Sequence, residues 1–432
     1  MNASATPTSR IVMFVYGDVS HDSLVLREAG SLAAAGHRVT VVARPVAGAA
    51  TGGGREQRDG FEIVRVPLPS GWRRPWRILG LPFRLAARLG DRLRPGLGLQ
   101  ETLAWLVIWR FAILGWAKAA ALVALPADVY HGHDLSGLPA AVAARRRHGG
   151  KAVYDSHEIF LEAGANVRRP AWIRRRFARR EAAWIRETSA LVTVNEGLLR
   201  DLGQRYELPA QAIAVHNCPP RWQPPAEPDL RLRTAIGCPT GVPVAIYHGS
   251  FAPHRGLEQL AAALLEPGME SVHAAYLGFG SQREALETMA ANGRYGGRLH
   301  VVGPVPPEEV VGWVSGADVD VMALQPSTLN HVLSTPNKLF EALAGGVPVV
   351  VSDFPGLRAI VVGDPDGPLG EVCDPASPAA IAAAIRRILE RSPKETADLR
   401  RRCLAAAHER WNWETESAKL IGLYASLGSG GG

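Results

Sequence analysis

The chain has 432 residues, a length typical of two or three domains. Hydrophobic residues make up 47% and charged residues 21%, so the composition is that of a folded globular protein and argues against disorder. The formal net charge is +7, and two arginine clusters in the N-terminal half suit an anionic partner such as lipid head groups, nucleic acid or a phosphorylated substrate. The first cluster comprises Arg65, Arg73, Arg74, Arg77, Arg84, Arg88, Arg92 and Arg94, and the second comprises Arg168, Arg169, Arg174, Arg175, Arg176, Arg179 and Arg180.

Cysteine usage and hydropathy exclude several classes of protein. The four cysteines form no CxxC pair, so a cysteine metal site and a disulfide scaffold are not expected, and a reducing cytoplasm fits best. Residues 1–10 are polar and show no signal-peptide pattern. The most apolar region, residues 102–127, is interrupted by Arg110 and Lys118, so no run reaches the ~18 clean apolar residues of a spanning helix. We therefore expect this region to be buried or to lie at an interface.

The first predicted elements form a βαβ unit. Residues 11–16 are a β-rich apolar run that ends at Gly17, as a buried strand entering a turn would. Apolar residues at helical spacing follow, Gly36 ends that helix, and residues 38–42 form the next strand. Strand, helix and strand in short order predict a parallel sheet.

The same alternation continues through the chain in two series. In the first half, further strands are predicted at residues 129–131, 152–154 and 191–194. The second series has strands at residues 244–247, 274–277, 300–302, 319–322 and 347–351, with helices at 257–265, 281–291, 308–315 and 337–344.

The alternation predicts an α/β fold of two Rossmann-like, doubly wound domains that face each other across a cleft. We expect an acceptor-side domain at residues 1–216, a proline-rich linker at 217–228 and a donor-side domain at 229–412, with a last helix, 413–427, packing back on the first domain. Ligands of open parallel sheets bind beyond the carboxyl ends of the strands, so a facing pair of sheets makes one site.

The most informative segment is residues 334–351, STPNKLFEALAGGVPVVV. Ser334 or Thr335 is expected to cap a helix with Pro336 in its first turn, and Gly345 and Gly346 are expected to end it. Unpaired amides at such a helix start, together with the helix dipole, favour an anion.

Two charged residues on that helix suit a nucleotide. Lys338 lies in the first turn, where it can meet a phosphate as a mobile point charge, and Glu341 shares its face one turn on. A carboxylate there can accept hydrogen bonds from ribose hydroxyls. The alternative is an ordinary capped helix with a surface Lys–Glu pair.

The same segment resembles the donor-site signature of the family-four glycosyltransferases, which are retaining enzymes of the GT-B fold. The resemblance rests on Asn337-Lys338, then Phe340-Glu341, then the Gly-Val-Pro-Val-Val run. It implies that Glu341 binds the ribose of a nucleoside diphosphate sugar and that Lys338 meets the diphosphate. Many members carry an additional glutamate eight residues before the second, at a position that is Leu333 here, whereas the branch with a Pro-Asn-Lys motif often lacks it.

Two loops of the second half support a donor site. Gly249 and Ser250 follow a strand, Gly249 permits close backbone approach, and Arg255 is placed to bind phosphate oxygens. The family has a glycine-rich turn here with a basic residue before its second glycine, which Arg255-Gly256 resembles. Gly278 lies in a second turn, which in the family is near the nucleotide base. The alternative for the first of these loops is a plain βα loop.

Polar residues of the first half end predicted strands. His133 and Asp134 close the strand that begins at residue 129, and a histidine in this loop contacts the donor sugar or its phosphate in the family. His133 is the expected match, because His131 alternates into the strand. The alternative is a buried histidine bonded to backbone. Gly17 is in the loop that lies against the donor diphosphate in the family.

The next strand ends in Tyr-Asp-Ser-His-Glu, which resembles a signature of one branch of the family. Asp155, His157 and Glu158 are expected to bind acceptor hydroxyls or to act in proton transfer. We assign catalytic roles to His133 and Glu158, and place Asp134 with Asp155 and His157 on the acceptor side.

Taken together, the residues and the resemblance predict a hexosyltransferase that moves a sugar from a UDP- or GDP-type donor to a hydroxyl of a glycan, a lipid-linked molecule or a small molecule. No DxD motif stands where a divalent metal is expected, so we expect no metal and no cofactor. A sugar-nucleotide epimerase of the same fold and a catalytically silent sugar-nucleotide or membrane-binding protein are the alternatives.

Tryptophans interleave with arginines in residues 72–118, a pattern that suits an anionic membrane surface and a peripheral location on its cytoplasmic side. The alternative is a solvated basic face over a packed helix. Nucleic acid is not expected as a partner, because the sequence contains no recognised binding module.

Overall fold

The computed structural model describes residues 8–46, 53–71 and 99–429. The chain divides into two compact units, and each is α/β. Unit 1 comprises Met1–Val194, Leu198–Val215 and Ser417–Gly432, and unit 2 comprises Asn195–Gly197 and His216–Glu416. Residues 217–228, expected to be a linker, thus group with unit 2, and the last helix joins unit 1 from Ser417 onward.

Unit 1 is built on an eight-stranded sheet in the order β3-β4-β2-β1-β5-β6-β7-β8. All neighbouring strands are parallel except β3 and β4, which form an antiparallel hairpin. The strands are β1 Arg10–Val15, β2 Arg38–Ala43, β3 Gly54–Arg58, β4 Phe61–Arg65, β5 Val129–His133, β6 Lys151–Ser156, β7 Ala190–Thr193 and β8 Gln211–Ala214.

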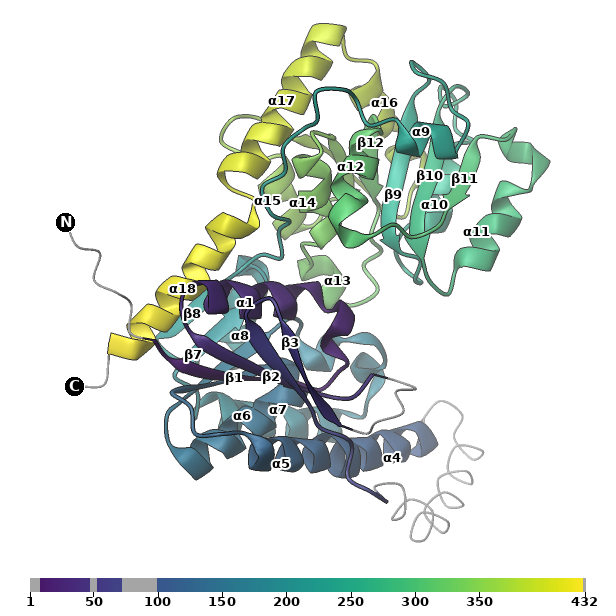
Figure 1. Ribbon diagram of the computed structural model, residues 1–432. Coiled ribbons are helices and arrows are strands. Elements are labelled where there is room, and N and C mark those ends of the chain that lie inside the picture. The colour runs from purple at the N-terminus through teal and green to yellow at the C-terminus, as the bar shows by residue number, and fades with distance from the viewer. Residues whose placement is uncertain (1–7, 47–52, 72–98, 430–432) are drawn as a thin grey trace, which may run out of the picture. The chain divides into compact units, whose positions relative to one another are not determined.

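The strand order of unit 1 reverses at β1, because β2 lies on one side of it and β5 on the other. The helices that follow β1 and β5, α1 and α6, consequently cover opposite faces of the sheet (Figure 1). The helices are η1 Val19–His21, α1 Ser23–Ala34, α4 Leu99–Val107, η2 Ile108–Ile113, α5 Leu114–Val123, α6 Asp134–His148, η3 Phe160–Glu162, η4 Gly164–Arg168, α7 Ala171–Ile185, α8 Glu196–Arg205 and α18 Trp413–Ser429.

Unit 2 has a six-stranded, fully parallel sheet in the order β11-β10-β9-β12-β13-β14. Its strands are β9 Val244–Ser250, β10 His273–Phe279, β11 Leu299–Val302, β12 Val319–Met322, β13 Val349–Ser352 and β14 Gly370–Cys373. Its helices are α9 Arg231–Ala235, α10 Leu257–Ala263, α11 Arg283–Ala290, η5 Gly293–Tyr295, η6 Pro307–Glu309, α12 Val310–Ser315, α13 Leu329–Leu333, α14 Asn337–Ala344, α15 Pro355–Val361, α16 Pro378–Leu389 and α17 Pro393–Glu409. The order reverses between β9 and β12, which makes the carboxyl end of β9 the place where a ligand is expected.

The expected alternation of strands and helices is confirmed, and every strand predicted from the sequence is present in the described residues. The β3–β4 hairpin, β8 and β14 had no expected counterpart. One boundary matters for function, because β5 runs to His133 and not to His131. Since residues two apart in a strand point to the same face, His131 and His133 lie together, with ring centroids 4.3 Å apart, and the expectation that they separate is wrong.

The apolar region of the first half forms α4, η2 and α5 as one helical run. Within the described residues, Gln100–Val123 is long and apolar enough to cross a membrane by length and composition alone, with a mean hydropathy of 1.7. Arg110 and Lys118 lie within this helical run, and core helices of soluble proteins can be as long and as apolar. Trp116 is fully buried and donates to the backbone carbonyl of Val66 at 3.0 Å, while Leu122 is exposed. Residues 72–98, the first part of the expected Arg/Trp region, lie outside the described residues.

Candidate active-site clusters

A hydrogen-bonded relay lies at the carboxyl end of β9 in unit 2. His248 on β9 is 2% exposed, and its Nδ1 lies 2.6 Å from Oδ2 of Asp320 on β12. Its Nε2 lies 3.0 Å from Oε2 of Glu341 on α14. Burial lowers the pKa of His248, but the Asp320 carboxylate and the bonds to both acids outweigh it and raise that pKa to about 9. His248 is therefore an imidazolium at neutral pH, donates from both nitrogens, and orients Glu341.

Lys338 presents a buried ammonium next to this relay. Its Nζ lies 3.4 Å from the centroid of the Tyr247 ring and has no hydrogen-bond partner among the described residues. Burial lowers the pKa of Lys338 to about 7, with Arg255 acting in the same direction against Asp320 and Glu341. The alternative of a surface Lys–Glu pair is wrong, because the Lys338 side chain packs inward on an aromatic face. A buried cation without a partner is costly, and an anion is what would relieve that cost.

The start of α14 also differs from the expectation. Pro336 is the N-cap residue and no side chain caps the helix, because Ser334 instead ends the preceding α13. The Thr335 hydroxyl accepts a hydrogen bond from Asn195 Nδ2 at 3.1 Å. The first amides of α14, beginning with Asn337, are consequently left without a side-chain acceptor, which suits an anion at this end of the helix.

Glycines bring backbone close together around these side chains. Gly249 and Gly278 are paired in register on β9 and β10, and a Cβ on Gly278 would lie 2.0 Å from the Gly249 carbonyl oxygen. Gly278 has a φ of 152° and Gly249 a φ of 110°, values that side chains rarely allow. Ser250, which ends β9, is exposed, and Arg255 in the following loop is half-buried. The structure thus gathers Gly249, Lys338 and Glu341, three of the expected donor residues, at one end of one sheet.

In unit 1, three imidazoles converge on one carboxylate. Asp155 Oδ2, at the end of β6, lies 2.8 Å from His133 Nδ1, 2.8 Å from His157 Nε2 and 3.4 Å from His131 Nε2. Burial alone raises the pKa of Asp155, but the charge of His157 and the polar contacts from all three histidines hold it well below its usual range. Burial lowers the pKa of His157, yet Asp155 and Asp134 raise it well above its usual range, so that His157 is an imidazolium paired with the Asp155 carboxylate.

His133 is the neutral member of this cluster. Burial first, and then its neighbour His131, lower the pKa of His133 to about 4, against the hydrogen bond to Asp155. Because the Asp155 carboxylate accepts at Nδ1, the proton of the neutral ring is on Nδ1 and the lone pair is on Nε2. His133 Nε2 has no partner among the described residues, so it is a hydrogen-bond acceptor held in a fixed orientation.

Two residues that the sequence reasoning missed lie behind the histidines. His131 Nδ1 is 2.7 Å from the Tyr424 hydroxyl on α18, and His131 Nε2 is 3.8 Å from Glu28 on α1. Burial, together with the nearby Asp155, raises the pKa of Glu28 well above its usual range. Glu28 could have been recognised in the sequence as a lone acid on the apolar face of a helix. Nothing in the sequence near Tyr424 indicates its contact with His131.

The side chains of Glu28, His131, His133 and Asp155 are of the types that bind metals, and one ligand atom of each lies within 4.8 Å of the others. However, His133 and Asp155 are 2.8 Å apart at their nearest atoms. Two ligands of a tetrahedral zinc, with bonds of about 2.0–2.1 Å, are roughly 3.3 Å apart. The spacing of this pair is thus that of a hydrogen bond, and we interpret the cluster as a proton-sharing network.

The loop after β6 carries the remaining expected residues. Asp134 begins α6 with a φ of 55°, which is uncommon outside glycine, and its Oδ1 accepts the His157 amide at 3.2 Å. Glu158 is exposed, but partial desolvation of its carboxyl group by the surrounding protein, and then the Asp134 carboxylate, raise its pKa to about 7. Gly17 is half-buried after β1, and a Cβ there would meet only Val15 Cγ1 at 3.8 Å, so the fold alone does not require glycine. His133, Asp134, Asp155, His157 and Glu158 are therefore brought together by β5 and β6.

The missed residues of unit 2 had a recognisable signal. Asp320 is a lone acid in the apolar strand β12, and His248 precedes the glycine that ends the apolar part of β9. A charged residue in a buried strand is expected to have a partner, because burial of an unpaired charge is costly. What the sequence could not indicate is that these two residues are partners of each other and of Glu341.

Comparison with known proteins defines the class of this protein. Residues 24–219 match the family described as "Glycosyl transferase 4-like domain", and residues 242–391 match "Glycosyl transferases group 1". The protein belongs to the family-four glycosyltransferases of the GT-B fold.

Individual relatives are distant. The chain is 28% identical over 251 residues to a D-inositol 3-phosphate glycosyltransferase of Xylanimonas cellulosilytica, an alignment that covers 55% of this chain and 57% of that protein. The chain thus spans little more than half the length of that relative. Among solved structures, the sucrose-phosphate synthase of Thermosynechococcus elongatus aligns with a TM-score of 0.68 at 18% identity, over 97% of this chain and 98% of that one. The Anabaena protein HepE in complex with UDP-glucose aligns with a TM-score of 0.64 at 15% identity, over 97% and 100% of the two chains. These likenesses show the fold.

Proposed function

We propose that this protein is a retaining glycosyltransferase that transfers a sugar from a UDP- or GDP-type nucleoside diphosphate sugar to a hydroxyl of a glycan, a lipid-linked molecule or a small molecule. The observation that carries the proposal is the Asp320–His248–Glu341 relay beside the unpaired ammonium of Lys338. A fixed carboxylate for a ribose and a buried cation for a diphosphate are the two contacts that a nucleotide donor needs. The complex of the Anabaena protein with UDP-glucose supports the donor class.

The donor diphosphate would be held by Lys338, Arg255 and the amides at the start of α14. These groups offset negative charge that grows on the leaving diphosphate, which stabilises the transition state. Gly249, Ser250 and Gly278 would supply backbone close to the nucleotide, and Asn337 contributes the first amide of α14. We propose that no metal ion takes part in donor binding, because Lys338 and Arg255 would supply the positive charge that a metal supplies to a diphosphate.

Unit 1 would supply the acceptor side. His133 Nε2, a lone pair without a partner, would accept a hydrogen bond from the donor sugar, and Asp155 fixes the orientation of its ring. Glu158, with a pKa of about 7, is suited to accept a proton from the acceptor hydroxyl or to hold that hydroxyl, with donor phosphate as the alternative proton acceptor. Asp134 and His157 hold this loop through the bond from the His157 amide.

The decisive experiment is thermal stabilisation by a panel of nucleotides and nucleotide sugars, with and without a chelator. A donor at ~100 times its dissociation constant adds about 2.7 kcal/mol to the free energy of unfolding. We expect one diphosphate sugar to stabilise the wild-type protein, both with and without chelator. The Glu341→Ala variant should lose this stabilisation. The control variant, Glu258→Ala on the exposed face of α10, should keep it. No shift with any nucleotide sugar would overturn the proposal.

Product analysis then separates transfer from its alternatives. The donor that stabilises the protein is incubated with sets of glycan, lipid-linked and small-molecule acceptors, and the anomeric configuration of any product is read by NMR. A product with the anomeric configuration of the donor supports a retaining transferase. An altered sugar nucleotide formed without acceptor would instead indicate an epimerase, and an inverted product would contradict retention.

A further inference from the structure

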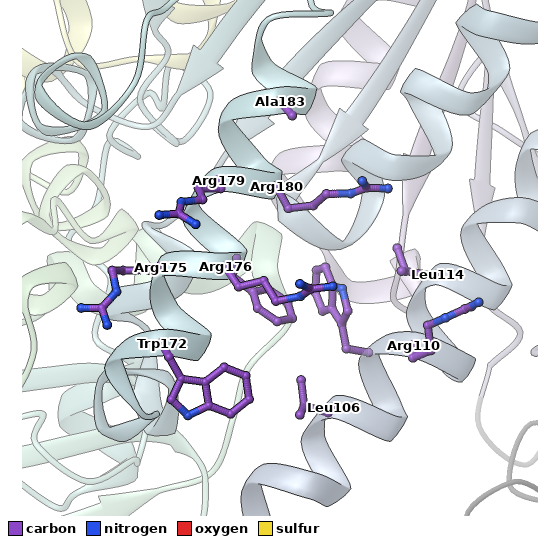
Figure 2. Close-up of a pocket in the computed structure, with 11 residues that line it drawn as sticks. Leu106, Arg110, Leu114, Trp172, Arg175, Arg176, Arg179, Arg180 and Ala183 are labelled. Atoms are coloured by element: carbon purple, nitrogen blue, oxygen red, sulfur yellow. The ribbon is translucent and has the colours of Figure 1, made fainter.

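A groove on unit 1 is separate from both clusters and lies between two helical segments. One wall is α7, and the other is the run of α4, η2 and α5; together they enclose about 940 Å³ (Figure 2). Its floor is aromatic, because Trp109 and Phe177 are nearly buried and pack edge to face at 4.9 Å between ring centroids. The wall that carries Trp109 and Arg110 is a π-helical turn, a departure from α-helix that is frequent at functional sites.

The rim of this groove is strongly basic. Arg175, Arg176, Arg179 and Arg180 line it from α7, and Arg110 lines it from the facing helix. Figure 2 shows Arg176 and Arg180 extending from α7 toward that facing helix. Within the part of the chain that the structure describes, no aspartate or glutamate lines the groove.

The charges of the rim are left unbalanced by the protein itself. Arg169 and Arg174, just outside the groove, pair with Glu101 and Glu162. By contrast, no ion pair is present at Arg176 or Arg180 among the described residues, although Arg180 lies over the Trp184 ring at 4.9 Å. Arginines four residues apart on one helix face repel each other, so the arrangement disfavours the isolated helix and calls for an anionic partner.

Apolar surface accompanies these charges. Trp172, which also lines the groove, is 59% exposed, and Ile108 on the facing helix is 42% exposed. Leu122 and Leu125 near the end of α5 are 63% and 65% exposed. Exposed tryptophan and leucine beside arginines are typical of proteins that lie in the interface of an anionic bilayer. A site for a polyanion such as nucleic acid does not require exposed aliphatic side chains.

The sequence immediately before this helix is also basic. Residues 72–98 contain seven arginines and a single carboxylate, Asp91. The same segment of the sequence also contains Trp72 and Trp76. An external anionic surface is therefore the occupant that the charges complement.

We propose that the groove between α7 and the α4–α5 helix binds the surface of an anionic phospholipid bilayer, with its arginines at the level of the phosphates and Trp172 among the head groups. This surface differs from the Arg/Trp region expected from the sequence, because most of its lining residues come from α7. It adjoins the acceptor loop, since Trp109 packs against Phe160 at 5.3 Å between centroids and Phe160 is two residues after Glu158. Resting on the proposed function, this continuity would present Glu158 to an acceptor held at the membrane.

Vesicle binding of the full chain tests the proposal. Pure phosphatidylcholine vesicles are compared with vesicles that also contain phosphatidylglycerol, by flotation at low and high salt. We expect binding only to the anionic vesicles, and weakening as salt screens the charges. Each arginine near an anionic surface contributes about fivefold to binding, so Arg176→Gln/Arg180→Gln should weaken it roughly 25-fold. The matched control, Arg147→Gln/Arg200→Gln, removes two exposed arginines of unit 1 that do not line the groove and should retain much tighter binding than the groove variant.

Three outcomes would overturn the membrane proposal. The first is no preference for anionic vesicles, and the second is an equal loss of vesicle binding in the groove variant and the control variant. The third is that heparin displaces the protein from the vesicles while Trp172→Ala leaves vesicle binding unchanged. The groove residues take no part in the donor site, so the donor-induced thermal shift of Arg176→Gln/Arg180→Gln checks that the variant is folded. Vesicle binding without any donor-induced shift would contradict only the proposed function, and a donor-induced shift without vesicle binding would contradict only the membrane proposal.

Discussion

The pH dependence of stability tests the Asp320–His248 pair without any knowledge of the substrate. The pKa of His248 is raised from 6.5 to about 9 in the folded protein. A group whose folded pKa lies above its unfolded value stabilises the fold fully below the unfolded pKa, and this contribution is lost as the pH rises through the folded pKa. The free energy of unfolding of unit 2 should therefore fall between about pH 6.5 and pH 9, by on the order of 3 kcal/mol, since each pKa unit corresponds to about 1.36 kcal/mol.

The perturbation is Asp320→Asn, which keeps the shape of the side chain but removes the carboxylate that faces His248 Nδ1 at 2.6 Å. We expect this variant to be less stable by about 3–5 kcal/mol at pH 6, because it leaves an imidazolium buried beside a neutral amide, and to lose most of the decline toward pH 9. Urea unfolding followed by tryptophan fluorescence measures both. The control, Asp353→Asn, breaks an ion pair with Arg358 at the surface and should change stability by less than about 1 kcal/mol. An Asp320→Asn protein with the same pH slope as the wild type would refute the reasoning.

The remaining predictions concern the donor and the acceptor. Glu341→Gln should weaken binding of the donor by about tenfold to a hundredfold in calorimetry, as expected for losing one or two hydrogen bonds to a charged acceptor, and unchanged affinity would remove Glu341 from the ribose site. Because the pKa of Lys338 is about 7 in the unliganded protein, affinity for the diphosphate should fall by up to about tenfold per pH unit above pH 7. The Lys338→Met variant should bind the diphosphate weakly at every pH. A wild-type affinity that is independent of pH from 6 to 9 would contradict this role of Lys338. The transfer rate should rise with pH through about 7 as Glu158 loses its proton. The Glu158→Gln variant should lower kcat by about 10²–10⁴ and abolish this rise with pH, while its affinity for the donor is kept. A pH–rate profile that Glu158→Gln leaves unaltered would assign the proton transfer to another group.

Much of the architecture follows from local sequence alone. Runs such as residues 244–248 and 319–322 are buried on both faces, as strands of a parallel sheet must be, and helical spacing between them implies crossover helices. The segment that begins at Asn337 forms a helix with Gly345 at its end, as its glycines and proline predict. These features are local because they depend on backbone preferences and on burial of one face.

The chemistry of the clusters depends on contacts between distant parts of the chain. His248 meets Asp320 and Glu341 across 72 and 93 residues, and His131 meets Tyr424 across 293. The sequence places each of these residues in a strand or on a helix, but only the order of the strands decides which of them become neighbours.

The protonation states of Lys338 and His133 also depend on the tertiary structure. From the sequence, Lys338 is an ordinary first-turn cation and His133 an ordinary histidine, and each could face solvent. In the folded protein Lys338 packs on the Tyr247 ring and His133 is fixed by Asp155, and burial lowers the pKa of both. Sequence therefore determined the fold and the residues available at its strand ends, whereas tertiary structure determined their partners and charges, because desolvation and electrostatic pairing depend on what surrounds a group in space and not on its neighbours in the chain.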